Sequence, residues 1–234
     1  GKEYKPIEFV LDSGKKVEIT GKIDRIDIAK TSDNKKVIRI IDYKSSIKNV
    51  DLNQVYAGLQ IQLLTYLDAI TSIEDVLPAG VLYFNLLDPI IKNNKNLTDE
   101  EIEEEIKKQF KMKGLILADV NIIRMMDKDL EKGYSSVVPA YIDKDGNISN
   151  TRSSIATLDE FNNLQKYINK LIKQISKEIL SGSIDIKPCY DAKNKTTACD
   201  YCSYKSICKF NSNQNEYEYI GNLSKDTIME KIKQ

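Results

Sequence analysis

Apolar residues near the N-terminus follow the period of two that is typical of β-strands. In residues 17–28 the apolar positions switch phase near Asp24 and Arg25, which predicts one strand with a bend or bulge at that point. The polar stretch KTSDNKK predicts a turn, and the apolar run after it predicts a second strand over residues 37–44. We expect these two strands to pair as antiparallel neighbours.

Farther along the chain, apolar residues recur every three or four positions, as they do on one face of a helix. A stripe from Leu52 to Ile70 predicts one amphipathic helix, and Asp51 with Gln54 is typical of a capping box at its start. Further helices are predicted over residues 98–109, 119–131 and 159–180.

Two of these helices carry clear start signals. Thr98 with Glu101 forms a capping box before a segment whose acids come first and whose lysines come last, as the helix dipole favours. We expect this segment to be a solvated helix. Thr157 with Glu160 forms another capping box before the longest predicted helix, which ends before Gly182.

The rest of the chain predicts shorter elements. Residues 81–87 are typical of a buried strand, and residues 135–149 predict a hairpin with Asp145 and Gly146 in its turn. Toward the C-terminus the composition becomes polar, loop-like and rich in cysteine. We therefore expect two parts, a core and a cysteine-containing segment, over residues 1–183 and 184–234.

Composition narrows the chemistry more than the fold. The 234 residues include 35 lysines and arginines, 35 aspartates and glutamates, and no histidine. The absence of histidine excludes Ser-His-Asp and Cys-His catalysis and histidine-ligated zinc. Hydrolysis by this chain must therefore use carboxylates, lysine, tyrosine or a metal ion. The chain has no G-x-x-x-x-G-K-[ST] segment, so no ATP-binding loop of that type is expected.

The sequence shows no signal for a membrane or for secretion. No apolar run approaches the roughly 20 residues that span a bilayer, and no signal peptide is recognisable. We therefore expect a cytoplasmic protein. The chain starts with Gly1 rather than methionine, which predicts a piece of a longer polypeptide.

Three short segments place polar side chains where the apolar runs end. GKIDRID contains Asp24, and IIDYKS contains Asp42 and Lys44 on one face at the end of the next strand. QIQLLTY contains Gln62 and Tyr66, which lie one helical turn apart. An isolated Asp-x-Lys is most often a surface ion pair of little energetic value. Two aspartates and a lysine on adjacent strands are instead typical of a metal-dependent active site.

Phosphodiester hydrolysis is the chemistry that uses such a set. Asp24 and Asp42 suit Mg²⁺ or Mn²⁺, which prefer oxygen ligands and keep several waters, and the backbone carbonyl of Tyr43 is a further candidate ligand. The metal ion lowers the pKa of a bound water and neutralises charge on the phosphate. Lys44 is suited to position that water or to stabilise the developing charge. The two polar side chains of the following helix are suited to contact a phosphate oxygen or to hold Lys44.

In this order, the three segments resemble the RecB-type branch of the PD-(D/E)XK nuclease superfamily. The resemblance is strongest to the AddB family of nuclease domains, and it covers most of the chain through GLQIQLLTYLDAI, RMMDKDLEKGYSSVVP, RSSIATLDEF and ACDYCSYKSICKF. It implies a restriction-endonuclease-like α/β core, with a mixed central sheet flanked by helices. By position, Asp24 and Asp42 would be metal ligands, Lys44 the catalytic lysine, and Gln62 and Tyr66 the helix motif.

The resemblance also implies a cellular role. Members of this family cut DNA with Mg²⁺ and process double-strand ends for recombinational repair in a bacterial helicase–nuclease, which implies an AddA-like partner subunit and bacterial cytoplasm. The chain departs from the family at one point. Members often have an upstream histidine or glutamate as a further metal ligand, and here only Glu8 and Glu18 are available, by default.

Four cysteines, Cys189, Cys199, Cys202 and Cys208, lie close together near the C-terminus. Metal ligation is expected before disulfides in a cytoplasmic chain, and the spacing alone allows either zinc or an iron–sulfur cluster. The resemblance implies a [4Fe–4S] cluster held by the last three cysteines and by a fourth far upstream, which this chain does not contain. Either Cys189 replaces that ligand or the thiols remain free or oxidised.

Lysines and tyrosines surround the cysteines. They predict either a surface that contacts phosphates and stacks on bases, or an ordinary loop whose tyrosines cover the cysteines. The side chains concerned are Lys187, Lys193, Lys195, Lys205, Lys209, Tyr190, Tyr201 and Tyr204.

Three functions follow from these observations. The first is a metal-dependent DNA nuclease, and the second is a catalytically silent module that binds DNA or a partner subunit through its cysteine cluster. The third is a zinc-stabilised structural protein, which leaves the acidic residues without a role. The presence of all five site residues favours the first, because a decayed site would have lost a member.

Overall fold

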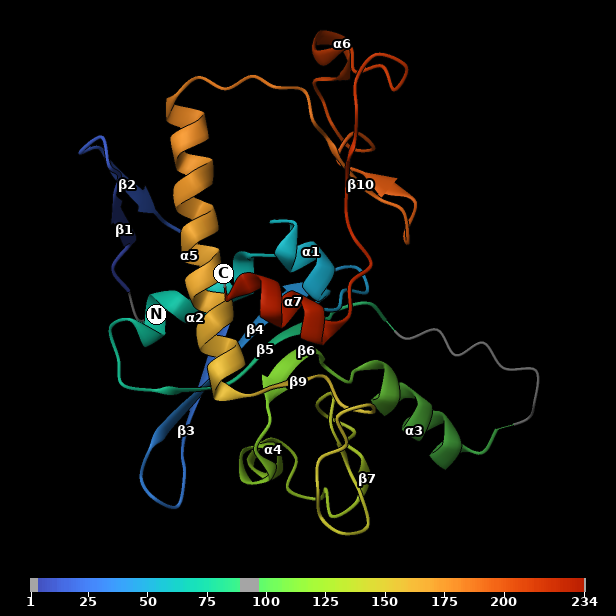
Figure 1. Ribbon diagram of the computed structural model, residues 1–234. Coiled ribbons are helices and arrows are strands. Elements are labelled where there is room, and N and C mark those ends of the chain that lie inside the picture. The colour runs from blue at the N-terminus through green and yellow to red at the C-terminus, as the bar shows by residue number, and fades with distance from the viewer. Residues whose placement is uncertain (1–3, 89–96, 234) are drawn as a thin grey trace.

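The computed structural model describes residues 4–88 and 97–233, and its centre is a mixed five-stranded sheet in the order β3-β4-β5-β6-β9 (Figure 1). Neighbours β3 and β4, and β5 and β6, run antiparallel, whereas β4 and β5, and β6 and β9, run parallel. The strands are β3 (Arg25–Lys30), β4 (Lys36–Lys44), β5 (Leu77–Asn85), β6 (Lys113–Leu117) and β9 (Ile155–Ala156).

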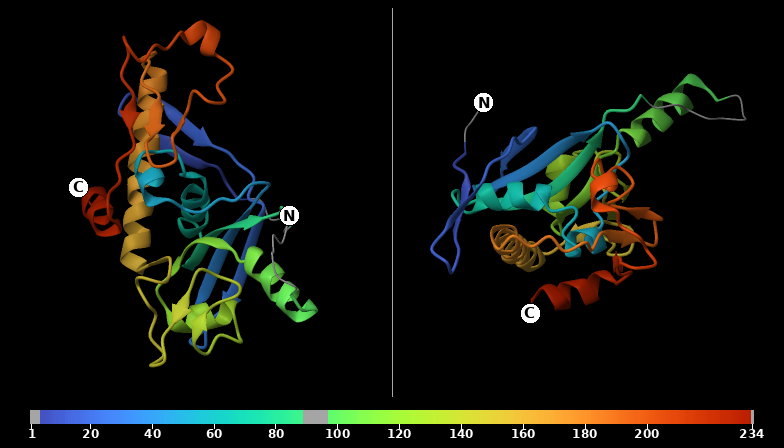
Figure 2. Two further views of the ribbon diagram at one scale, coloured as in Figure 1. Left: turned by 90° about the vertical axis from the view of Figure 1, so that its right-hand side faces the viewer. Right: turned by 90° about the horizontal axis from the view of Figure 1, so that it is seen from above.

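Helices cover both faces of this sheet, which confirms the predicted α/β class (Figures 1 and 2). One face lies under α1 (Leu52–Tyr56), α2 (Gln62–Thr71), α5 (Leu158–Leu180) and α7 (Lys225–Ile232). The other face packs on α4 (Val120–Met126) and on the loops that follow it. The helix α3 (Asp99–Gln109) projects from one edge of the molecule and buries none of its residues, as expected for a solvated helix.

The central strand β4 is buried on both sides because it lies between two strands and between two helical layers. Ile38 and Ile40 face α2 and α5, and Ile41 faces the opposite layer. Each of these side chains is at most 2% exposed. Burial of one such side chain stabilises the fold by about 1.5–3 kcal/mol, so the position and register of β4 are strongly determined.

Smaller elements surround the core. A hairpin of β1 (Ile7–Val10) and β2 (Lys16–Ile19) packs beside α5, and a second pair joins β7 (Gly133–Tyr134) to β8 (Tyr141–Ile142). The cysteine-containing segment stands at the top of Figure 1 and includes β10 (Cys189–Asp191), β11 (Thr196–Thr197), α6 (Lys205–Cys208) and β12 (Glu218–Tyr219).

The single strand predicted over residues 17–28 is wrong. The chain forms β2, leaves regular structure, and forms β3 only from Arg25 onward. These two strands have different partners, because β2 pairs with β1 and β3 pairs with β4. The switch in apolar phase marks a change of sheet rather than a bulge, and Asp24 lies just before β3 instead of inside a strand.

The single helix predicted over residues 51–70 is also wrong, because the chain makes two helices. Gly58 has φ of +80°, which ends α1, and α2 begins at Gln62. Asp51 caps α1 as predicted, but its side chain accepts the backbone N–H of Asn53. The side chain of Gln54 instead donates to Asp191, in the cysteine-containing segment, so the expected capping box is absent.

Other local predictions have mixed outcomes. The capping boxes at Thr98 and Thr157 are both present, and a short helix lies within residues 119–131. The predicted turn at Gly146 is present, but the two sides of that hairpin share a single bridge, between Ile142 and Ile148. The strand β8 pairs instead with β7, which precedes the predicted hairpin.

The last helix, α7, places Ile228, Met229 and Ile232 in the main core. The C-terminal 51 residues proposed as a separate part therefore include an element that packs on the sheet layer, while the boundary itself stays a prediction. Among the described residues, no helix is long and apolar enough to cross a membrane.

Candidate active site

Asp42 and Lys44 stand where β4 leaves the core. The alternation of the strand places both side chains on the face of Ile38 and Ile40, which is the face that α2 covers. Asp42 is only 4% exposed, and its Oδ2 lies 2.6 Å from Lys44 Nζ. Apart from this ion pair, Asp42 Oδ2 has no hydrogen-bond partner among the described residues. A buried carboxylate oxygen with a single cationic neighbour is suited to accept a second cation.

Asp24 reaches the same edge from the neighbouring strand. The ladder between β3 and β4 ends at the pair of Arg25 and Ile41. Beyond that point the backbone N–H of Tyr43 donates to Asp24 Oδ2 at 3.0 Å, so the side chain continues the pairing that the backbone has stopped. The carboxylates of Asp24 and Asp42 are therefore fixed at consecutive positions of one rigid strand end.

The helix α2 supplies the third side of this site. Lys44 Nζ donates to Gln62 Oε1 at 3.4 Å, and Gln62 Nε2 donates to the Tyr66 hydroxyl at 3.0 Å. Gln62 is the first residue of α2, and Tyr66 follows one turn later on the same face. The structure thus brings four of the predicted side chains into one chain of contacts, from Asp42 through Lys44 and Gln62 to Tyr66.

Tyr83 is a neighbour of the site that the sequence did not reveal. It lies opposite Asp42 in the parallel register of β4 and β5, and its ring centroid is 5.6 Å from Lys44 Nζ. Burial raises the pKa of the Tyr83 hydroxyl, and the charge of Asp42 raises it further. The ring presents its π face to the ammonium, which favours the cation. The residue lies in an ordinary apolar run, and only the strand register puts it beside Asp42.

The charged residues of β3 form a separate group. Asp27 accepts from Arg25 Nε at 2.7 Å and from Arg39 Nη2 at 2.5 Å. Burial alone would raise the pKa of Asp27, but the hydrogen bonds from the two arginines outweigh it and hold that pKa below its usual range. The same hydrogen bond raises the pKa of Arg25. These side chains are a structural network with no free carboxylate oxygen for a metal ion.

The residues at the strand end fit a hard divalent cation. Mg²⁺ keeps several waters, so one or two carboxylates and a carbonyl oxygen suffice to hold it, and the buried Oδ2 of Asp42 lacks other partners. No third acidic, cysteine or histidine side chain joins Asp24 and Asp42 within the described part of the chain. Glu8 and Glu18 are exposed partners of each other in the hairpin of β1 and β2.

The cysteines do not form a comparable centre. All four thiols are free and partly exposed, and no three of them lie together as metal ligands in the described residues. Cys189 belongs to β10, where burial raises the pKa of its thiol and the charge of Glu218 adds to that effect. The residues as arranged here therefore do not fit an iron–sulfur cluster or a four-cysteine zinc site.

The tyrosines of this segment divide into two groups. Tyr190 packs against Tyr217 and Tyr219, with ring centroids 5.2 and 5.7 Å away. Tyr201 and Tyr204 are 95% and 69% exposed. Neither pattern covers a cluster of thiols, and the two exposed rings lie beside α6.

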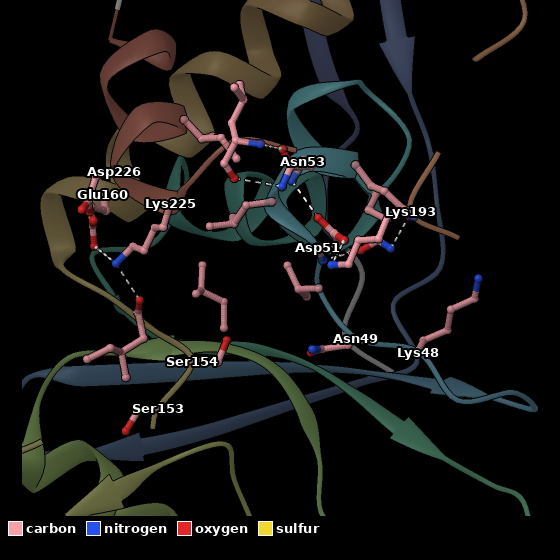
Figure 3. Close-up of a pocket in the computed structure, with 18 of the residues that line it drawn as sticks. Lys48, Asn49, Asp51, Asn53, Ser153, Ser154, Glu160, Lys193, Lys225 and Asp226 are labelled. Atoms are coloured by element: carbon pink, nitrogen blue, oxygen red, sulfur yellow. Dashed lines mark hydrogen bonds and ion pairs between the residues drawn. The ribbon is translucent and has the colours of Figure 1, made fainter. Parts of the chain in front are cut away.

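A large hollow of about 1140 Å³ begins three residues after Lys44, on the side of α1 and α7 (Figure 3). None of the predicted catalytic residues lines it. Its lysines are neutralised, because Lys225 Nζ lies 2.8 Å from Glu160 and Lys193 Nζ lies 3.8 Å from Asp51. This hollow is thus separate from the carboxylate site.

Comparison with known proteins agrees with the geometry of the strand end. The family profile described as the PD-(D/E)XK nuclease superfamily matches residues 1–209. The chain belongs to the PD-(D/E)XK nuclease superfamily. A mixed sheet that carries an aspartate, one residue and a lysine at the end of a central strand is the arrangement found here.

Curated relatives share most of the chain. It is 48% identical over 220 residues to the AddB subunit of the ATP-dependent helicase/deoxyribonuclease of Acetivibrio thermocellus, covering 92% of this chain and 19% of that protein. It is 45% identical over 239 residues to the proteins of the same name from Bacillus thuringiensis and Clostridium kluyveri, covering 98% of this chain and 20% of each. The chain thus spans about one fifth of the length of these relatives.

Proposed function

We propose that this chain is a Mg²⁺- or Mn²⁺-dependent deoxyribonuclease that hydrolyses phosphodiester bonds. The observation that carries the proposal is the meeting of Asp24, Asp42 and Lys44 at one strand end, with Lys44 Nζ 2.6 Å from a buried oxygen of Asp42. Membership of a nuclease superfamily supports it, and so do relatives named as helicase/deoxyribonuclease subunits.

Each residue has a defined part in this proposal. Asp24 and Asp42 hold the metal ion, with the carbonyl of Tyr43 as a further ligand. The bound ion supplies a Lewis acid and a water of lowered pKa. Lys44 places its ammonium beside the phosphate oxygens, where it stabilises the negative charge that develops during hydrolysis. Gln62 accepts a hydrogen bond from Lys44 and is itself oriented by Tyr66, so the helix holds the lysine in place.

The test is cleavage of labelled single-stranded and nicked DNA with Mg²⁺, with Mn²⁺, and with a chelator. We expect cutting only with a metal ion, and its loss in Asp42→Asn, which preserves the shape of the side chain. Asp33→Asn is the matched control, because Asp33 lies in the exposed turn between β3 and β4 and should cut like the parent. Equal cutting by Asp42→Asn would contradict the proposal.

A second candidate is a catalytically silent module that binds DNA or a partner subunit. It is favoured by the lack of a third carboxylate beside Asp24 and Asp42 in the described residues. Metal-independent DNA binding without any cutting, in this chain and in the full-length polypeptide, would select this candidate over the nuclease.

The role of the cysteines depends on more of the polypeptide. We propose that Cys199, Cys202 and Cys208 hold a [4Fe–4S] cluster in the full-length protein, with the fourth ligand from outside this chain or from Cys189. The C-x₂-C-x₅-C spacing supports this, although the thiols are not gathered here. Metal analysis of anaerobically purified full-length protein should find iron, and stoichiometric zinc would contradict it.

The wider role follows from the names of the relatives. We propose that the domain works within a bacterial cytoplasmic helicase–nuclease, with an AddA-like partner subunit, and processes double-strand ends for recombinational repair. The exposed lysines of the cysteine-containing segment are proposed to contact DNA, namely Lys193, Lys195, Lys205 and Lys209. Copurification of a tagged full-length protein with a helicase subunit tests the partnership.

A further inference from the structure

One side of α5 carries lysines without acids. Residues 161–177 contain Lys166, Lys170, Lys173 and Lys177 and no aspartate or glutamate. Spacings of four, three and four residues place these lysines along one face of the helix. All four are exposed. We call this set the α5 lysine stripe.

A surface hollow of about 570 Å³ follows the stripe. Its lining consists of the four lysines with Asn169 and Gln174. The opposite face of α5 is fixed to α2, because Gln165 donates to Thr71 at 2.6 Å and Asn169 donates to Asp68 at 2.9 Å. The stripe is therefore mounted on the helix that also carries Gln62 and Tyr66 of the candidate active site.

The charges of the stripe are largely uncompensated. Lys166 and Lys170 form no ion pair with any described residue, and Lys173 lies over the ring of Phe9 at 5.4 Å. Only Lys177 is paired, with the exposed Asp12. Asp68, the acid that Asn169 contacts, is partly buried, and burial raises the pKa of its carboxyl group.

Lysines elsewhere in the chain are neutralised. On α3, Lys107 lies 2.8 Å from Glu103 and Lys108 lies 2.6 Å from Glu105. The hollow of Figure 3 is similar, since its Lys193 and Lys225 face acids. A chain with equal numbers of basic and acidic residues thus has a segregated positive face on α5. Such a face attracts a polyanion.

We infer that the α5 lysine stripe binds the phosphate backbone of the DNA strand, at a contact separate from the candidate active site. The stripe runs along α5 from Lys166 to Lys177, which is about 16 Å at a rise of about 1.5 Å per residue. Phosphates of one strand follow each other every ~3.4 Å along a duplex, so the stripe is long enough to meet several of them. The choice of DNA rests on the proposed nuclease function.

The test compares two double variants of this chain in a chelator, so that binding is measured without cutting. Lys166→Gln with Lys170→Gln removes the two unpaired charges, and glutamine has a similar helix propensity. Lys107→Gln with Lys108→Gln is the matched control on α3. The readout is fluorescence anisotropy of a labelled oligothymidylate of about 20 nucleotides between about 50 and 200 mM salt.

For the stripe variant, we expect the slope of log K against log salt to shrink by about 1.4, because each single-strand phosphate contact contributes about 0.7. Two such contacts correspond to about 25-fold weaker binding at about 0.1 M salt, and the two affinities should converge toward 1 M. The α3 variant should bind like the parent.

Three outcomes would overturn the inference. They are an unchanged slope and affinity in the stripe variant, an equal loss in the α3 variant, and a parent chain that does not bind the oligonucleotide. Loss of binding to polyglutamate with unchanged DNA binding would assign the stripe to an acidic protein instead. Failure of the nuclease proposal looks different, because the stripe would then bind DNA normally while no metal ion supports cutting.

Discussion

The end of β4 and the loop of the last three cysteines differ in how their polar side chains are held. Asp42 and Lys44 extend from a strand that is paired on both sides and buried between two layers. Cys199, Cys202 and Cys208 lie in short turns and in the four-residue α6. The first group meets within hydrogen-bond distance, whereas the second does not gather.

This difference has a physical cause. A buried strand has one register that keeps its apolar side chains inside, so its last residues have fixed positions. A loop with few buried side chains has many conformations of similar free energy, and it needs a ligand to select one of them. The carboxylate site is therefore organised before it binds a metal ion, and the thiols would be organised only by binding one.

The largest expected effect concerns the organised site. Lys44→Met should lower the rate of DNA cutting by about 10²–10³-fold, because it removes a positioned charge from the reacting phosphate. The mutant should keep its affinity for DNA in a chelator. Single-turnover cleavage measures the effect, and Lys187→Met, in the exposed segment before β10, is the control. A loss of less than about threefold would remove Lys44 from the chemistry.

The comparison also predicts unequal costs of truncating an isoleucine in the two regions. Ile40→Ala should lower the free energy of unfolding by about 2–5 kcal/mol, because Ile40 is fully buried in β4. Ile207→Ala, beside the cysteines in α6, should change it by at most about 0.5 kcal/mol, because Ile207 is 78% exposed. Urea denaturation measures both. Similar losses in the two variants would contradict the view that α6 is weakly held.

A smaller effect is expected at Tyr83, which we regard as a positioning residue for Lys44. Tyr83→Leu should lower kcat about tenfold with little change in KM, because a ring face contributes on the order of 1 kcal/mol to holding an ammonium. Tyr83→Phe keeps the ring and should restore most of the rate. If Phe and Leu behave alike, the ring does not hold Lys44, and equal losses of Mg²⁺ affinity and stability would assign Tyr83 to packing alone.

The smallest effect concerns Cys189, the one cysteine held in a strand of the C-terminal segment. Because its pKa is raised, less of the reactive thiolate is present at about pH 8, and alkylation should be several-fold slower in the folded than in the urea-unfolded chain. The difference should close once the pH exceeds the raised pKa. Mass spectrometry of the labelled peptides measures this. Equal rates in both states would show that β10 does not bury this thiol.

Much of the local structure could be predicted from the sequence, because its signals lie within a few residues. The caps at Thr98 and Thr157, the solvated helix and the pairing of β3 with β4 depend on neighbouring positions, and all were predicted. The break at Gly58 was missed because the apolar stripe runs through it without a change of period. The change of partner between β2 and β3 was missed because the pattern of one strand does not say which sheet it joins.

For the candidate site, the sequence by itself determined the residue types and the strand end that carries Asp42 and Lys44. Only the tertiary structure decided that Asp24 accepts the N–H of Tyr43, that Gln62 reaches Lys44, and that the ring of Tyr83 lies against Lys44. These contacts join positions 18 to 39 residues apart in the chain, and they depend on the register of β4 with β3 and β5. Register is set by the burial of both faces of the sheet at once, and no single segment contains that information.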